Sequence, residues 1–193
     1  MTTEGSSSGA TESAGKAKKP APQKRREPEV ARAAVALPPE GVALAERLPG
    51  AFGSHGIEVD AAIDEVVCIV PADRLIDLCR QLKDDPSFGF TYLRLLTVVD
   101  YVEQDGEFEL VYHLFSLANH HKMMVKTRIP ERRASVPSVT GVWRGANWYE
   151  REMHDLFGVD FEGHPDLSPL MLPDDFEGFP GRKSYPLNDY EEW

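Results

Sequence analysis

Long apolar runs, cysteine-rich patterns and a secretion signal are all missing from this 193-residue chain. No apolar stretch approaches the ~20 residues needed to span a bilayer, so any membrane association must go through a partner. The N-terminus lacks the apolar core of a signal peptide. The two cysteines, Cys68 and Cys79, are too few for the thiolate set of an iron–sulfur cluster, and we expect them to be reduced and buried.

Nucleotide-binding and hydrolase motifs are also missing. The sequence holds no Gly-x-Gly-x-x-Gly and no phosphate-binding loop, so the chain itself should not bind NADH. A Gly-x-Ser-x-Gly nucleophile elbow is absent as well. The net charge of −11 and the pI near 5.0 argue against nucleic-acid binding, which needs clustered Lys and Arg. We therefore expect no catalytic centre, no metal and no cofactor on this chain.

Residues 1–36 are rich in Ser, Gly, Ala, Lys and Pro and contain almost no large apolar side chain. Such a segment cannot bury enough surface to offset chain entropy, so we expect it to be disordered. Its basic cluster, Lys16–Arg26, is expected to be a solvated tail rather than a lipid or partner site. The sequence thus divides into a disordered segment of residues 1–36, a domain of residues 37–157 and an extended segment of residues 158–193.

Strand patterns fill the middle of the domain. Val66–Val70 is a continuous apolar, largely β-branched run of strand length. Tyr92–Val102 and Phe108–Leu117 are joined by a link ending in Asp105-Gly106, which is typical of a hairpin. Lys122–Ile129 predicts a third neighbouring strand. The short links favour an antiparallel sheet.

Helical periodicity flanks these strands. Leu44, Leu48 and Phe52 predict a short first helix, which Pro49 is expected to cut. After Pro71 a second helix is predicted from four residues that share one face, Leu75, Leu78, Cys79 and Leu82.

The last predicted helix begins at Ser138, a plausible N-cap, and runs to Phe157, with Gly158 as its C-terminal stop. The whole pattern predicts an α+β fold, with a largely antiparallel sheet, helices on one face and an extended C-terminal tail.

The C-terminal segment combines helix-breaking residues with large apolar ones. Its prolines and glycines forbid a long helix or a central strand, whereas disordered tails are poor in aromatics. Ordering its 36 residues costs several tens of kcal/mol at about 1–2 kcal/mol each. Burying its twelve large apolar side chains at roughly 2 kcal/mol each returns a smaller sum. Because these side chains are spread along an extended chain, we expect a permanent protein partner with the tail wrapped over it. The excess of acids from Glu150 onward predicts basic patches on that partner.

The end of the last helix and the tail resemble one family closely. The family signature is Glu-Arg-Glu, an acid three residues later and a downstream Gly-His-Pro, found here as Glu150-Arg151-Glu152, Asp155 and Gly163-His164-Pro165. The match spans roughly residues 40–187, and it includes Arg182-Lys183. On these residues the chain resembles the thirty-kilodalton subunit of respiratory complex I, known in bacteria as the C subunit of NADH-quinone oxidoreductase.

Two sites depart from the family pattern. Many members carry Arg or Lys where this chain has Ser168-Pro169, and commonly Leu where it has Gly181. Both changes remove a charge or an apolar anchor at the presumed partner contact.

The resemblance implies a non-redox peripheral-arm subunit of a proton-translocating NADH-quinone oxidoreductase. Its implied partners are the quinone-site (forty-nine-kilodalton-type) subunit and neighbouring iron–sulfur subunits. Iron–sulfur clusters, flavin and quinone would all sit on other subunits. The complex would hold the chain peripherally at the cell membrane, on the cytoplasmic side, with no nucleic-acid partner.

Seven residues are expected at the subunit interface. Arg151 is expected to bond a carboxylate of the tail or the partner, and Glu150 and Glu152 to accept from partner arginines. The full set is Glu150, Arg151, Glu152, Asp155, His164, Arg182 and Lys183.

Other interpretations of these residues remain open. Glu150 and His154 share a helix face and could ligate a metal, although a two-residue match is weak. His164 could hydrogen-bond near a quinone pathway or simply stabilise a local turn, and His120-His121 fits a solvated turn. As for function, a membrane-bound [NiFe] hydrogenase or another non-NADH donor complex could hold an equivalent subunit. A free-standing hydrolase using Asp174-Asp175 is the second alternative.

Overall fold

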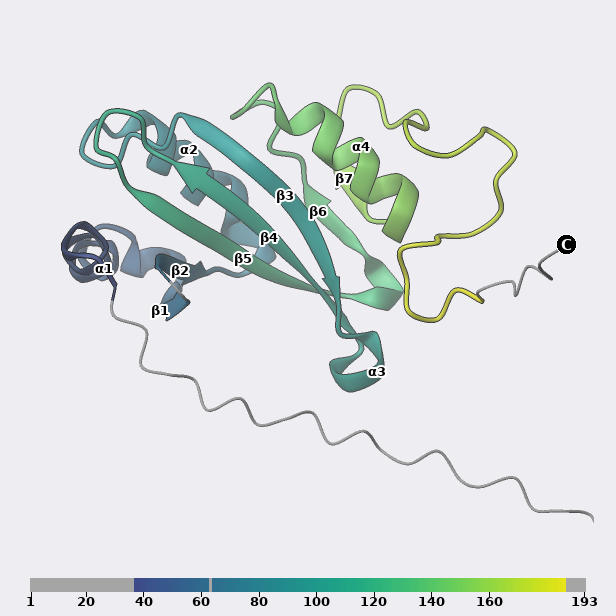
Figure 1. The fold of residues 1–193 in the computed structure, drawn as a ribbon, viewed down its shortest axis with the longest axis horizontal. Coiled ribbons are helices and arrows are strands. Elements are labelled where there is room, and N and C mark those ends of the chain that lie inside the picture. The colour runs from purple at the N-terminus through teal and green to yellow at the C-terminus, as the bar shows by residue number, and fades with distance from the viewer. Residues whose placement is uncertain (1–36, 63, 187–193) are drawn as a thin grey trace, which may run out of the picture. The chain divides into compact units, whose positions relative to one another are not determined.

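A five-stranded sheet forms the centre of the fold, in the order β1-β2-β5-β4-β3 (Figure 1). The computed structural model describes residues 37–62 and 64–186, so the expected disorder of residues 1–36 lies outside the described residues. The strands of the sheet are β1 (Glu58–Ala62), β2 (Glu65–Ile69), β3 (Tyr92–Asp100), β4 (Glu107–Phe115) and β5 (Lys122–Pro130).

Neighbouring strands are antiparallel except for β2 and β5, which pair in parallel. The predicted hairpin is confirmed as β3 and β4. Its link contains one helical turn, α3 (Val102–Asp105), and Gly106 follows in the left-handed region with φ of 74°. Strand β1 was not predicted, because its half-exposed acidic sequence carries no apolar alternation. The parallel pair was not predicted either, since it is made by strands far apart in the sequence.

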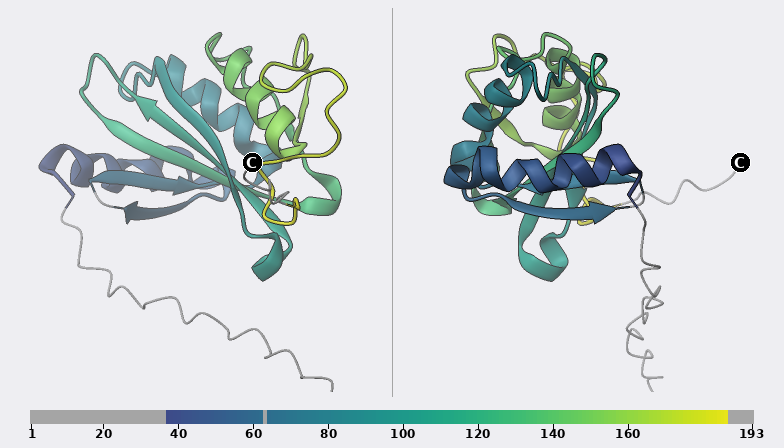
Figure 2. Two further views of the ribbon diagram at one scale, coloured as in Figure 1. Left: turned by 45° about the vertical axis from the view of Figure 1, so that its right-hand side comes forward. Right: turned by 90° about the vertical axis from the view of Figure 1, so that its left-hand side faces the viewer.

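Three longer helices cover one face of the sheet, as predicted. A single apolar core contains side chains from α1 (Pro39–Phe52), α2 (Leu75–Asp84), α4 (Ala146–Phe157) and the covered face of the sheet. Helix α1 contacts β1 and β2 at one end of the sheet, and α4 contacts β3 at the other (Figure 2). Short 3-10 turns at Gly53–His55, Ala72–Arg74 and Glu131–Arg133 link these elements.

The predicted break at Pro49 is wrong, because α1 continues through it to Phe52. A proline inside a helix removes one backbone hydrogen bond. Leu48 and Phe52 are nonetheless buried, and the Phe52 ring lies 4.8 Å from that of Phe88. Anchoring these side chains, at roughly 2 kcal/mol each, outweighs the lost bond.

The predicted start of the last helix at Ser138 is also wrong, because α4 begins at Ala146. The Ser138 hydroxyl does not cap the helix. It hydrogen-bonds the Glu150 carboxylate instead, at 2.6 Å. The backbone N–H groups of Val142 and Trp143 both donate to the Val139 carbonyl, which makes a tight turn ahead of the helix. The predicted end is confirmed: Gly158 adopts φ of 69° directly after α4.

Candidate partner interface

The C-terminal segment begins as part of the domain. Val159 and Phe161 are 0% and 1% exposed, and they belong to the main core. Here the chain forms β7 (Asp160–Glu162), which pairs in parallel with β6 (Ser135–Pro137). The expectation that these apolar residues wait for a partner is therefore wrong for the first few residues of the segment.

Arg151 of α4 holds the next stretch. Its guanidinium donates to the backbone carbonyl of Ser168 at 2.9 Å, to the Ser168 hydroxyl at 3.1 Å and to the Pro169 carbonyl at 2.8 Å. The expected contact of Arg151 with the tail is present, but its acceptors are carbonyl and hydroxyl oxygens rather than a carboxylate.

Asp155, one turn further along α4, holds the following two residues. Its Oδ2 accepts the backbone N–H groups of Leu170 at 2.6 Å and Met171 at 2.8 Å. The residue is only 7% exposed. Asp155 and Arg151 thus bind adjacent carbonyl and amide groups, and together they fix the path of the backbone rather than particular side chains.

A second clamp lies near the end of the described tail. Arg182 donates to the Phe157 carbonyl at 2.7 Å and to Glu131 at 3.2 Å, and its guanidinium stacks over the Phe108 and Phe179 rings. The buried Asp100 at the end of β3 accepts the Lys183 backbone N–H at 2.9 Å.

Asp100 was missed at the sequence level, because it reads as the polar end of a strand. Its burial would have been a signal, but burial is not visible in the sequence.

Glu150 does not face a partner. Its side chain is 0% exposed, and its oxygens accept the Val139 backbone N–H at 2.7 Å and the Ser138 hydroxyl at 2.6 Å. Burial raises the pKa of Glu150 to about 7, even though both hydrogen bonds favour the ionised form. The expected acceptance of partner arginines by Glu150 is corrected to a role inside this chain.

His164 is also internal, with a side chain that is 0% exposed. Its Nδ1 accepts the Asp166 backbone N–H at 3.0 Å, and its Nε2 lies 3.3 Å from the Asn147 carbonyl. Of the two roles left open for His164, the structure supports stabilisation of the local turn.

The two departures from the family pattern take part in this anchoring. Ser168 and Pro169 supply all the tail acceptors of Arg151. The Gly181 backbone N–H donates to the Leu156 carbonyl at 2.9 Å, and a Cβ there would lie 2.9 Å from that same oxygen. Gly181 thus permits a close backbone approach that a larger residue would prevent.

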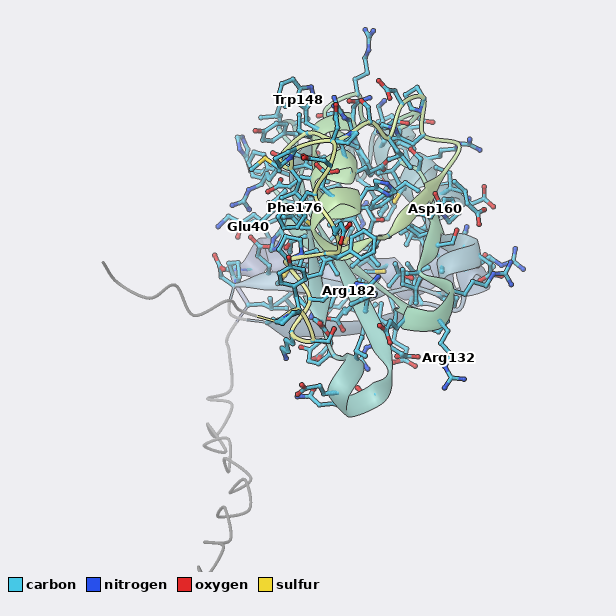
Figure 3. All side chains as sticks on the ribbon, turned by 90° about the vertical axis from the view of Figure 1, so that its right-hand side faces the viewer. Glu40, Arg132, Trp148, Asp160, Phe176 and Arg182 are labelled. Atoms are coloured by element: carbon cyan, nitrogen blue, oxygen red, sulfur yellow. The ribbon has the colours of Figure 1, made fainter. Side chains whose placement is uncertain are left out.

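The anchored tail leaves large apolar side chains facing outward. In Figure 1 the residues after β7 form a wide arch beside α4, and Figure 3 shows Trp148 and Phe176 on the same side of the molecule. Trp148 is 66% exposed, Met171 59%, Phe176 40% and Phe179 37%. We call these four residues the outer apolar set. Exposed large apolar side chains gathered in one region mark a protein interaction surface.

The described residues offer little for catalysis. They contain no group of three or more His, Cys, Asp or Glu side chains placed to hold a metal ion, and His154 Nδ1 lies 2.9 Å from the Val159 carbonyl. Cys68 and Cys79 are fully buried, as expected, and burial raises the pKa of the Cys68 thiol to about 12. Such thiols are inert as nucleophiles. Within residues 37–62 and 64–186, no helix is long and apolar enough to cross a membrane.

The geometry is that of a binding subunit with a preformed, outward-facing tail. The model of the family described as respiratory-chain NADH dehydrogenase, 30 Kd subunit, matches residues 68–191. The second NADH-quinone oxidoreductase C subunit of Rhizobium meliloti (strain 1021) is 43% identical over 143 residues, which cover 74% of this chain and 78% of the relative. The NADH-quinone oxidoreductase C subunit of Roseiflexus castenholzii (strain DSM 13941 / HLO8) is 46% identical over 122 residues, 63% of this chain and 70% of the relative.

Solved structures agree with this relationship. A trypsin-resistant fragment of Nqo5 superposes with a TM-score of 0.56 and 30% identity, over 63% of this chain and 98% of the fragment. A chain of the membrane-bound sulfane sulfur reductase, an archaeal respiratory membrane complex, gives a TM-score of 0.66 and 32% identity, over 77% of this chain and 86% of that one. The chain belongs to the thirty-kilodalton subunit family of respiratory-chain NADH dehydrogenase. It is a peripheral-arm subunit of a larger complex.

Proposed function

We propose that this chain packs against the quinone-site subunit of a proton-translocating NADH-quinone oxidoreductase and stabilises that subunit's geometry. The observation that supports the proposal best is the tail itself. Its backbone is fixed by Arg151, Asp155, Asp100 and Arg182 of the same chain, while its outer apolar set has no cover within the described residues.

Anchoring the backbone before assembly lowers the entropic cost of binding. Fixing a residue costs about 1–2 kcal/mol, and a tail already held by its own domain does not lose that freedom again on docking. The partner then needs to supply only an apolar groove for the outer set and basic groups for the exposed acids Asp174, Asp175 and Glu177.

On this proposal, the redox chemistry belongs to other subunits. Iron–sulfur clusters, flavin and quinone would be bound by neighbours, and this chain would act by position alone. Its association with the cell membrane, on the cytoplasmic side, would be peripheral and would run through the complex. Glu152 and Lys183 remain predicted partner contacts, and the Lys183 side chain is exposed.

Met171→Glu tests this interface. A charge placed in a desolvated apolar contact is costly, so we expect at least a tenfold loss of the quinone-site subunit and iron–sulfur subunits in a tagged purification from gently solubilised membranes. Leu117→Glu is the matched control, since Leu117 is 62% exposed in the β4–β5 turn, outside the tail. Equal recovery of partners with both variants, or recovery of the wild-type chain alone, would contradict the proposal.

A subunit of a non-NADH donor complex remains the second candidate. Its supporting observation is the similarity to a chain of the archaeal sulfane sulfur reductase, which is a respiratory complex but not a hydrogenase. The same purification separates the two candidates, because an NADH dehydrogenase module co-purifies only in the first case.

A further inference from the structure

Two titratable side chains meet in the interior where the tail leaves β7. Glu150 comes from α4, and His164 comes from the turn of residues 163–166. The Nε2 of His164 lies 3.9 Å from Oε2 of Glu150, and both side chains are 0% exposed. Neither group serves the outward-facing surface, yet the pair joins the start of the tail to the helix that anchors it.

The hydrogen bonds fix where protons sit in this pair. A backbone N–H can only donate, so the bond from Asp166 to Nδ1 of His164 leaves Nδ1 unprotonated and places the proton of the neutral ring on Nε2. By the same reasoning Oε1 of Glu150, which accepts the Val139 N–H, carries no proton. A proton on Glu150 therefore sits on Oε2, 2.6 Å from the Ser138 hydroxyl oxygen.

The surroundings offer no fixed positive charge to an ionised Glu150. The loop before α4 contributes the uncharged Ser138 and Thr140, whose hydroxyls lie 2.7 Å apart. Helix α2 contributes Cys79 and strand β4 contributes Tyr112, both buried, and burial raises the pKa of each far above neutrality. Between pH 4 and pH 9, roughly, only Glu150 and His164 can change charge here.

We propose that Glu150 and His164 form a proton-dependent latch: a protonated Glu150 lets the 163–166 turn close against α4, and loss of that proton loosens the turn and the tail behind it. An ionised carboxylate in this interior needs either water or a cationic His164. Water can enter only if the turn opens. A second proton on His164 requires Nδ1, and Nδ1 becomes available only if the Asp166 bond breaks. Both routes move the same turn.

The direction of the pH effect follows from linkage. In the closed state the pKa of Glu150 is raised from 4.5 to about 7, whereas in the open state water restores the ordinary value. The closed state is therefore favoured at low pH, and opening becomes easier as pH rises from 4.5 to 7. The opening equilibrium should grow about tenfold per pH unit across this window, about 300-fold in all, and then level off.

Hydrogen–deuterium exchange of the full chain between pH 4.5 and 8.5 tests the latch, with rates corrected by an unstructured peptide reference. Peptides spanning residues 163–183 should lose protection up to pH 7 and then stay level, while peptides of β4 and β5 stay protected throughout. Glu150→Gln should remove the pH dependence and keep the tail protected, because its amide can accept from Val139 and donate to Ser138. Glu152→Gln on the same helix should behave like the wild type.

A flat wild-type profile would overturn the proposal, as would an unchanged pH dependence in Glu150→Gln. A parallel loss of protection in β4 and β5 would also overturn it, because the effect would then be global unfolding. If Glu150→Gln fails to fold, the wild-type comparison of tail and sheet decides alone. The outcome is independent of the proposed partner, since the experiment uses the isolated chain.

Discussion

Gly158→Ala is expected to lower the free energy of unfolding by about 2–3 kcal/mol and to release the second clamp of the tail. Gly158 ends α4 with φ of 69°, a conformation that costs other residues about 1–2 kcal/mol. A Cβ at this position would also lie 2.6 Å from the Phe179 ring and 2.8 Å from Nη2 of Arg182. Both side chains must move, which breaks the Arg182 bond to the Phe157 carbonyl.

Gly163→Ala is the matched control for this prediction. Gly163 has φ of 82°, but no heavy atom lies within 4 Å of a Cβ built there. The control therefore carries the conformational cost without the steric one, and we expect a loss of about 1 kcal/mol. Denaturant unfolding measures both values. Equal losses would show that the Phe179 and Arg182 contacts contribute nothing.

Asp155→Ala is expected to free the middle of the tail without unfolding the domain. The substitution removes the shared acceptor of two backbone N–H groups, and hydrogen bonds to a charged group contribute about 1.5–3 kcal/mol each. We expect the amides of Leu170 and Met171 to exchange at least 30-fold faster, corresponding to about 2 kcal/mol.

Hydrogen exchange resolved by residue checks this expectation, with Glu152→Ala as the control on the same helix. The β4 amides should keep their protection in both variants, because Asp155 contacts the tail and not the sheet. Unchanged exchange at Leu170 and Met171 in Asp155→Ala would show that other contacts hold the tail.

Much of the fold could be predicted because periodicity reports local structure. The buried face of α2 and the runs of β3, β4 and β5 follow directly from the spacing of their apolar residues. The errors came from tertiary contacts. Pro49 stays helical because Phe52 is anchored in the core, and Ser138 bonds a carboxylate twelve residues away rather than the helix end.

The candidate site was predicted in its membership but not in its geometry. The signature residues do meet, yet Glu150 and His164 point inward, and Arg151 and Asp155 hold the backbone of their own tail. The energetic argument for a partner assumed that the tail could not be ordered by the domain. It counted apolar side chains and could not count hydrogen bonds from buried charged groups to tail backbone, which composition does not show.

The most direct test of the proposed function places a photo-crosslinking amino acid at Phe176 in a tagged chain assembled in native membranes. Phe176 lies on the tail arch and is 40% exposed in the isolated chain. Glu103 in α3, which is exposed outside the tail, is the control position. We predict a cross-link from position 176 to the quinone-site subunit and none from position 103. Absence of a product at position 176, or cross-linking only to lipid or to unrelated proteins, would contradict the account.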